Sequence, residues 1–165
     1  MKIVFFGVGA VCSVMATLLD ELSNKSKQKD INFVFVVRNI KKAQGHFFKN
    51  SNILNKSDFL EIKHFEEIFE DSKKYEKYLQ NSDIFINSST PSFNLPIMNL
   101  ALKYNTNYAD LASDIYKDEI ISTLKFDQQI LENEFKSQNL FALINLGISP
   151  GITNFLIGEK IHSLK

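Results

Sequence analysis

Lys2-Ile3-Val4-Phe5-Phe6-Gly7-Val8-Gly9-Ala10-Val11-Cys12 is the stretch that decides the fold of this 165-residue chain. Its apolar residues predict a buried strand, and the two glycines after them predict a tight turn that opens a helix. Gly7 would permit the turn, and Gly9 would let the backbone approach phosphate groups faced by the N–H groups of the helix start. The stretch therefore indicates a site for a dinucleotide pyrophosphate, with a purely structural turn as the alternative.

The third small residue of this fingerprint is replaced by Cys12. Glycine or alanine at that position lets the helix pack closely on the strand. A buried cysteine behaves as a small hydrophobic residue, so we expect an intact turn and a slight separation of the helix from the strand.

The composition is that of an ordinary globular protein without a strong charge bias. Hydrophobic residues make up 44% of the chain and charged residues 23%, and 19 basic side chains balance 19 acidic ones. This balance indicates neither nucleic acid nor a membrane as the main partner. The single cysteine predicts no internal disulfide and no cysteine-based zinc site, and the three histidines lack ligand spacing. We expect a cytoplasmic protein without a metal centre.

Strands and helices alternate along the rest of the chain. Strands are predicted at 33–37, 59–62, 84–87, 107–111 and 140–144, and helices at 40–50, 66–80, 95–102, 117–138 and 152–162. In the first helix, the residues Val11, Val14, Met15, Leu18, Leu19 and Leu22 recur at helical spacing and are expected to face the sheet. The alternation predicts an α/β fold, a single domain built on a doubly wound parallel sheet.

Arg38 follows the second predicted strand, at the position that lies beside the adenosine ribose in this kind of sheet. An acidic residue there would bind the 2′-hydroxyl of NAD, whereas the planar guanidinium of arginine matches a phosphate. Arg38 therefore predicts NADP in preference to NAD. The alternative is an arginine that ends the strand and points into water.

Ser88-Ser89-Thr90-Pro91 follow the strand at 84–87, and open α/β sheets bind ligands at the carboxyl ends of their strands. The hydroxyl groups could contact ribose or phosphate, or the loop could merely turn the chain and cap the next helix. Asp110 would lie near the same edge, either beside the ligand or as a turn cap. No general acid or base can be chosen from these residues.

Four stretches together resemble the saccharopine dehydrogenase family. They are Gly7–Val11, Asn87–Pro91 with Asn94-Leu95-Pro96, Tyr108–Ala112, and Ser149-Pro150-Gly151-Ile152-Thr153-Asn154. The family includes saccharopine reductases, carboxynorspermidine dehydrogenases and homospermidine synthases. The resemblance implies an NAD(P)-binding Rossmann domain of an oxidoreductase that transfers hydride to or from CH–NH bonds of amino-acid or polyamine substrates.

The resemblance also implies roles for individual residues. It makes Gly7, Gly9, Ala10 and Val11 the pyrophosphate turn, Arg38 the partner of the 2′-phosphate, Ser88, Ser89 and Thr90 contacts on the ribose or nicotinamide side, and Asp110 with the Gly147–Gly151 loop the edge of the nicotinamide site. Acid–base chemistry is expected from a substrate domain, so no catalytic residue is assigned.

The resemblance divides the chain into a nucleotide-binding domain at 1–146 and, at 147–165, a loop and helix leading toward a substrate domain that is absent here. We therefore expect cofactor binding without turnover, and self-association as a homodimer through the apolar last helix. A non-catalytic module that binds or senses NADP is the main alternative. A methyltransferase that uses S-adenosylmethionine would need an acidic residue where Arg38 stands.

Overall fold

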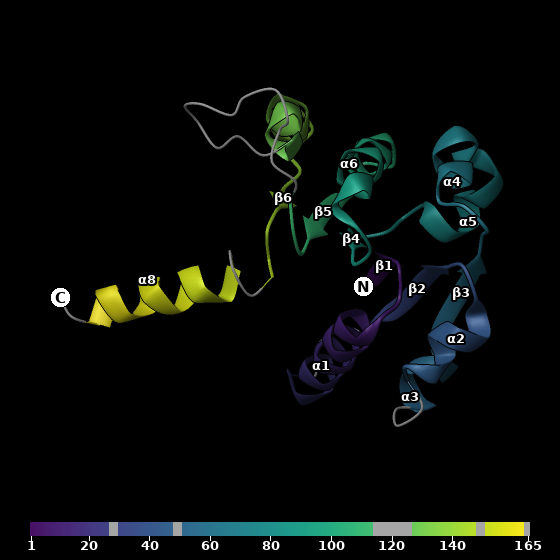
Figure 1. Ribbon diagram of the computed structural model, residues 1–165, viewed down its shortest axis with the longest axis horizontal. Coiled ribbons are helices and arrows are strands. Elements are labelled where there is room, and N and C mark those ends of the chain that lie inside the picture. The colour runs from purple at the N-terminus through teal and green to yellow at the C-terminus, as the bar shows by residue number, and fades with distance from the viewer. Residues whose placement is uncertain (27–29, 48–50, 114–126, 148–150, 164–165) are drawn as a thin grey trace.

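The computed structural model describes residues 1–26, 30–47, 51–113, 127–147 and 151–163, which form a parallel sheet flanked by helices (Figure 1). The six strands have the order β3-β2-β1-β4-β5-β6. Their bounds are β1 Lys2–Phe6, β2 Asn32–Val37, β3 Ser57–Glu61, β4 Ile84–Asn87, β5 Asn107–Asp110 and β6 Ala142–Leu143. This order confirms the predicted doubly wound sheet, with β1 and β4 at its centre.

The helices connect these strands. The α-helices are α1 Ala10–Ser26, α2 Ile40–Gly45, α3 Ser51–Asn55, α4 Glu66–Glu70, α5 Glu76–Leu79, α6 Asn94–Lys103, α7 Glu132–Ser137 and α8 Thr153–Ser163. Short 3₁₀ helices lie at Ser72–Tyr75, Pro91–Phe93 and Asp127–Leu131. None of the helices in the described ranges is long and apolar enough to cross a membrane.

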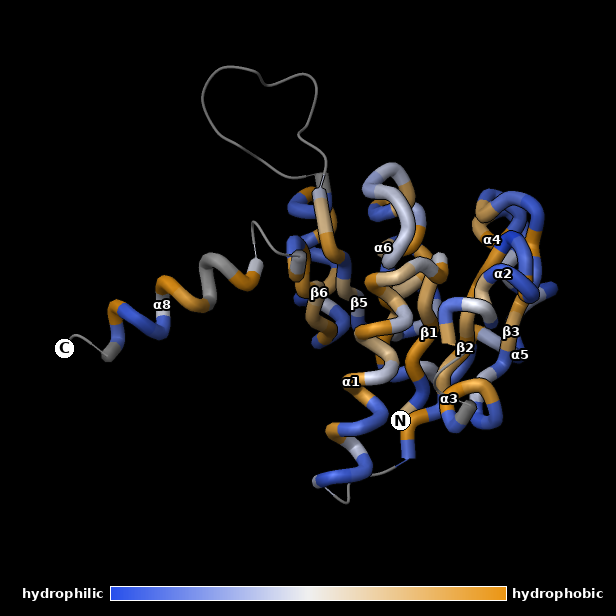
Figure 2. The backbone as a smooth tube through the Cα atoms, turned by 60° about the horizontal axis from the view of Figure 1, so that its bottom comes forward, coloured by the Kyte–Doolittle hydropathy of each residue, from blue (hydrophilic) through white to orange (hydrophobic). Residues whose placement is uncertain are grey.

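Alternate strand residues point to opposite faces of the sheet, and helices cover and bury both faces. One face carries Ile3, Phe5, Phe33 and Phe35 and packs with Cys12 and Ala16 of α1 and Ala43 of α2. The other face carries Val4, Phe6, Val34 and Val36 and packs with Ile68 of α4, Leu79 of α5 and Ile97 of α6. Two-sided burial explains the continuous hydrophobic runs of the central strands, which stand out in Figure 2.

Helix α1 lies on the sheet through a narrower stripe than its sequence predicts. Its buried residues are Cys12, Ala16, Asp20 and Ser23, whereas Val11, Val14, Leu18 and Leu22 are 52–61% exposed. The prediction that these four face the sheet is therefore wrong. The buried stripe is made of small side chains, which let the helix axis approach the bulky phenylalanines below it.

Asp20 lies on this buried stripe, although its charge places it on the solvent side in the sequence pattern. Its carboxylate forms an ion pair with Lys56, the residue between α3 and β3, and accepts a hydrogen bond from Asn24. A buried carboxylate needs such partners. The ion pair therefore ties α1 to the outer part of the sheet.

Three other predicted elements differ from the structure. The single helix expected at 66–80 is broken at Asp71, whose backbone leaves the helical region, into α4, a 3₁₀ turn and α5. The helix expected at 40–50 ends at Gly45, and residues 48–50 lie outside the described residues. The buried strand expected at 140–144 is a two-residue edge strand with Phe141 and Leu143 half exposed.

Positions 117–126 of the helix expected at 117–138 lie outside the described residues. The same holds for Ser149 and Pro150 of the last stretch that resembles the family. Helix α8 stands apart from the sheet in Figures 1 and 2, and Leu156, Ile157 and Ile161 are exposed on it. Self-association through this helix stays a prediction.

Candidate functional site

The carboxyl ends of the parallel strands meet along one edge of the sheet. That edge carries Gly7 after β1, Arg38 after β2 and Ser88 after β4, with Asp110 at the end of β5. Strands β1 and β4 are neighbours, and the chain leaves them toward opposite ends of the sheet. Open α/β sheets bind their ligands at such a switch point. The structure thus brings the predicted site residues to the edge where a ligand is expected.

The fold requires a glycine at position 7, whether or not a ligand is bound. Its φ is +93°, a backbone conformation that side chains disfavour, and a Cβ atom there would lie 2.9 Å from the Cβ of Ser89. The Gly7 N–H donates to the carbonyl of Val36 at 3.0 Å, which ties the turn to β2. The turn is therefore packed directly beneath the loop that follows β4.

Ser88 holds this loop to the turn. Its backbone N–H donates to the carbonyl of Phe6 at 3.1 Å, and its hydroxyl donates to the carbonyl of Gly7 at 2.7 Å. The hydroxyl predicted to contact ribose thus binds the backbone of the glycine turn. Its remaining lone pairs can still accept a hydrogen bond.

Gly9 has a different environment from Gly7. Within the described ranges, no heavy atom outside its chain neighbours lies within 4 Å of the position a Cβ would occupy. Open space at a glycine gives room for a ligand to approach the backbone, as a pyrophosphate requires. Gly9 therefore has no packing role of the kind that Gly7 has.

Helix α1 begins directly after Gly9, at Ala10. Ala10 and Val11 are exposed, and the first turn of α1 contains no acidic side chain. The first N–H groups of a helix have no partner within the helix, and they attract anions together with the helix dipole. Seventeen residues make α1 long enough for this effect. These features fit a bound diphosphate.

A buried network of asparagines shapes the loop after β4. Asn87 is 3% exposed, and its side-chain amide donates to the carbonyl of Thr90 at 3.0 Å and to Oδ1 of Asn94 at 2.6 Å. The same side chain accepts hydrogen bonds from the backbone N–H and the hydroxyl of Ser89, at 3.0 and 2.7 Å. Asn87 therefore fixes the course of the whole loop.

Asn94 extends this network to β5. Its Oδ1 accepts from the Tyr108 hydroxyl at 3.0 Å, and its amide donates to the carbonyl of Ala112 at 2.8 Å. Neither asparagine is among the site residues predicted from the sequence. The signal available in the sequence was an amide side chain, Asn87, closing an otherwise apolar strand.

The hydroxyl groups of the loop do not cap α6, which was the alternative to ligand contact. The residue before α6 is Phe93, without a side-chain cap, and the 3₁₀ turn Pro91–Phe93 separates the loop from the helix. Ser89 and Thr90 are exposed, and the Thr90 hydroxyl lies 2.9 Å from that of Ser92. Both residues are therefore exposed at this edge of the sheet without capping α6.

Asp110 is buried, with 1% of its surface exposed. Its carboxylate accepts hydrogen bonds from the Asn145 N–H at 2.8 Å and from the Gln128 amide at 3.0 Å. Its carbonyl accepts from the Leu146 N–H at 2.9 Å. Asp110 therefore fastens the segment after β6 to the end of β5, and its carboxylate is engaged inside the protein.

Gly147 belongs to this fastened segment and is partly buried, with its carbonyl accepting from the Ile152 N–H at 2.9 Å. Gly151 has a φ of +133°, and a Cβ there would lie 2.8 Å from the carbonyl oxygen of Asn145. A side chain at position 151 would therefore clash with the backbone of Asn145.

Arg38 is exposed at the end of β2, and no ion pair with it occurs in the part of the chain that the structure describes. The next residue, Asn39, caps α2 by accepting from the Lys42 N–H at 2.8 Å. The cap fixes the backbone after Arg38 and leaves the guanidinium free to meet a ligand or water.

Cys12 is a core residue with 1% exposure, and burial raises the pKa of its thiol to about 12. The thiol is therefore protonated at neutral pH and chemically inert. It packs among Ile3, Phe5 and Ala16.

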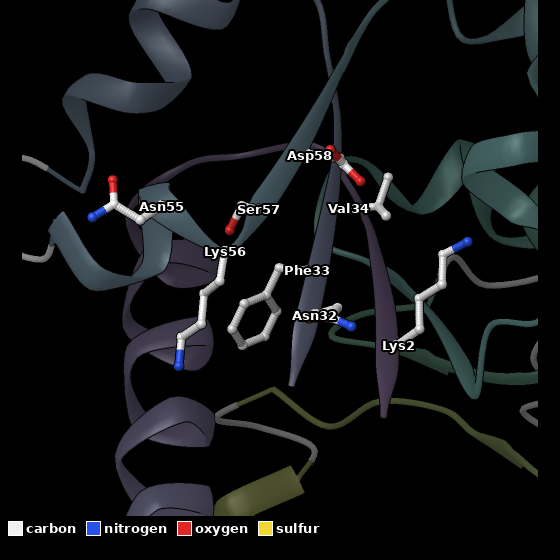
Figure 3. A pocket seen from close by; sticks show the side chains of 8 residues that line it. All are labelled: Lys2, Asn32, Phe33, Val34, Asn55, Lys56, Ser57 and Asp58. Carbon is white, nitrogen blue, oxygen red and sulfur yellow. The ribbon is translucent and has the colours of Figure 1, made fainter. Parts of the chain in front are cut away.

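A hollow of about 460 Å³ lies at the opposite edge, near the amino ends of β1, β2 and β3 (Figure 3). Its two lysines are held by the protein, because Lys2 donates to the carbonyl of Gln80 at 2.8 Å and Lys56 pairs with Asp20. The hollow is separate from the glycine turn, and its cations have internal partners.

Comparisons with known proteins agree with this geometry. The family described as the saccharopine dehydrogenase NADP binding domain matches residues 3–143. No curated protein matches the sequence. Saccharopine dehydrogenase (L-Glu forming) from Saccharomyces cerevisiae matches with a TM-score of 0.67 and 19% identity over 98% of this chain, which spans 31% of the yeast chain.

Two further solved structures share the fold at lower similarity. Shikimate dehydrogenase from Mycobacterium tuberculosis has a TM-score of 0.53 and 13% identity over 88% of this chain and 46% of its own. dTDP-glucose 4,6-dehydratase from Bacillus anthracis, in complex with NAD, has a TM-score of 0.54 and 11% identity over 87% of this chain and 53% of its own. At such identities the likeness shows the fold alone.

The sheet and its glycine turn thus define a dinucleotide-binding domain of the Rossmann class. The chain belongs to the family of saccharopine dehydrogenase NADP-binding domains. The resemblance inferred from the sequence is confirmed.

The contrast between the two glycines of the turn gives a first prediction. Gly7→Ala should lower the free energy of unfolding by about 1–3 kcal/mol, because the variant combines a left-handed backbone with a clash against Ser89. Gly9→Ala, the matched control, should change it by less than about 0.5 kcal/mol, since its Cβ meets open space. Urea unfolding measures both values. Equal losses for the two variants would contradict the packing described.

Asp110 gives a second prediction, on pH. Burial raises the pKa of its carboxyl above the ordinary 3.8, and the hydrogen bonds from Asn145 and Gln128 offset this only in part. The folded chain therefore binds the proton more tightly than the unfolded chain. The contribution of Asp110 to the free energy of unfolding is greatest below its unfolded-state pKa and is lost as the pH rises through the folded-state pKa.

Asp110→Asn removes this titration and keeps an acceptor for the Asn145 N–H. Urea unfolding of both proteins from about pH 4 to about pH 7 should show the wild type losing stability relative to the variant as the pH rises. A constant difference across this range would show that the carboxyl titrates alike in both states.

Proposed function

We propose that this chain binds NADP through the turn between β1 and α1, with the pyrophosphate over Gly9 and the first N–H groups of α1. The observation that carries the proposal is the open space at Gly9, beside a long helix without acidic residues in its first turn. Gly7, Ala10 and Val11 complete the turn. The family's NADP-binding domains supply the same expectation from sequence.

Arg38 is proposed to bind the 2′-phosphate and so to favour NADP over NAD. It is exposed at the end of β2, on backbone fixed by the Asn39 cap. Lys41 and Lys42 are exposed in the first turn of α2 and add positive charge to the same end of the strand. A guanidinium can bind a phosphate through two parallel hydrogen bonds, which a hydroxyl cannot match.

The residues after β4 and β5 are proposed to line the ribose and nicotinamide side. Ser89 and Thr90 are exposed and can contact the ligand directly, whereas Ser88 binds the Gly7 carbonyl and acts by shaping the turn. Asp110 acts in the same indirect way, because its carboxylate holds the segment that contains Gly147. Asp110 is therefore proposed as a positioning residue.

The activity that we propose for the whole protein is hydride transfer at a CH–NH bond of an amino-acid or polyamine substrate. Bound NADP supplies the hydride acceptor or donor, and residues 1–146 position it at the sheet edge. Residues 147–165 connect this domain to the part of the protein that holds the substrate. Hydride transfer needs the substrate held against the nicotinamide, and this domain is proposed to hold the cofactor in that contact.

The test of NADP binding uses Arg38→Ala. The dissociation constant for NADP should rise about ten- to a hundredfold, as expected for loss of hydrogen bonds to a charged group, while that for NAD stays the same. Titration of NADPH and NADH fluorescence measures both constants. Lys25→Ala is the matched control, because it removes one exposed positive charge from the far end of α1.

Two results would contradict the proposal at different levels. Weak or absent binding of both nucleotides to the wild-type chain would remove the dinucleotide function. If the wild-type chain binds both nucleotides tightly and Arg38→Ala leaves the ratio of their dissociation constants unchanged, only the role of Arg38 is contradicted.

A further inference from the structure

Glu61 is the last residue of β3 and lies beside the end of β2. The register of the two strands pairs it with Val37, the residue directly before Arg38. Its carboxylate Oε1 accepts a hydrogen bond from the backbone N–H of Ile40 at 3.2 Å. Glu61 therefore brings a negative charge to the loop that carries Arg38, although it is 23 positions away in sequence from that residue.

The backbone around this carboxylate is well defined. Asn39 caps α2 through the Lys42 N–H at 2.8 Å, and the Ala43 N–H donates to the Asn39 carbonyl at 3.0 Å. Glu61 accepts a hydrogen bond from the Ile40 N–H. Asn39 and Glu61 together therefore provide acceptors for two N–H groups in the first turn of α2. Both Arg38 and Glu61 are exposed, and they form no ion pair with each other within 4.0 Å in the described structure.

The neighbouring ends of β2 and β3 thus carry side chains of opposite charge, Arg38 and Glu61. A 2′-phosphate placed beside Arg38 is attracted by the guanidinium and repelled by the nearby carboxylate. A 2′-hydroxyl carries no charge, and it can donate a hydrogen bond to a carboxylate. Glu61 therefore disfavours the phosphate without disfavouring the hydroxyl.

We propose that Glu61 is a specificity-determining residue that opposes Arg38 at the adenosine 2′ position and limits the preference for NADP over NAD. This inference rests on the proposed dinucleotide site. The choice between NADP and NAD then depends on Glu61 of β3 as well as on Arg38 after β2. The hydrogen bond to Ile40 is what holds the carboxylate beside the loop.

Glu61→Gln tests this directly, because glutamine keeps an acceptor for the Ile40 N–H and removes only the charge. The dissociation constant for NADP should fall about two- to fivefold, the size of effect that exposed charge pairs show, and that for NAD should stay the same. The measurement is the titration of both nucleotides at low salt. At about 1 M salt the difference between variant and wild type should disappear, because the charges are screened.

Asp58→Asn is the matched control. It removes one exposed negative charge from the same strand, three residues away and about 10 Å nearer its amino end, so it should leave the nucleotide ratio unchanged. Thermal unfolding of each variant verifies that α2 and β3 remain folded.

An unchanged NADP-to-NAD ratio in Glu61→Gln, with the wild type binding both nucleotides, would overturn the role of Glu61 and leave the dinucleotide site intact. A loss of affinity for both nucleotides would also overturn it, because Glu61 would then act only by supporting α2. If the wild-type chain binds neither nucleotide, the dinucleotide site fails and the role of Glu61 fails with it.

Discussion

The contact between the Gly7 turn and the loop after β4 is the constraint on which the candidate site depends. Ser89 lies so close to Gly7 that no side chain fits between them, and Ser88 binds the carbonyl of Gly7. The turn is thus held from above by β4 and from the side by β2, through Val36. The shape of the turn therefore follows from packing at the ends of β1, β2 and β4. These internal contacts fix the position at which α1 begins.

The asparagines behind that loop explain how a polar edge is built on an apolar sheet. Asn87 and Asn94 are buried, yet their amides bind each other, Ser89, Thr90, Tyr108 and Ala112. Buried polar groups stabilise a structure only when their hydrogen bonds are made. The network therefore specifies one loop conformation, in which Ser89 and Thr90 are exposed at the edge of the sheet.

The sequence predicts the sheet and the turn because both have strong local signals. Gly7 and Gly9 follow an apolar strand, and residues 33–37 are apolar throughout, as strands covered on both faces are. The face of α1 could not be predicted in the same way. Periodicity favours the large residues Val14 and Leu18, whereas close packing on the phenylalanines of the sheet selects Cys12 and Ala16.

Long-range partners were equally hidden in the sequence. Nothing local indicates that the Asp110 carboxylate binds a backbone N–H 35 residues away, or that Glu61 binds the start of α2. The break at Asp71 and the shortness of β6 also depend on tertiary context. The individual roles of the edge residues therefore need the folded structure, even where the sequence places them at the correct edge.

The most direct measurement of the central claim follows the backbone N–H groups of the turn. An amide nitrogen–proton NMR spectrum of the ¹⁵N-labelled chain should show its largest shifts at Gly9, Ala10 and Val11 as NADP is added, because a diphosphate binds at those groups. An absence of shifts, or shifts confined to the hollow at the amino ends of β1, β2 and β3, would contradict the account.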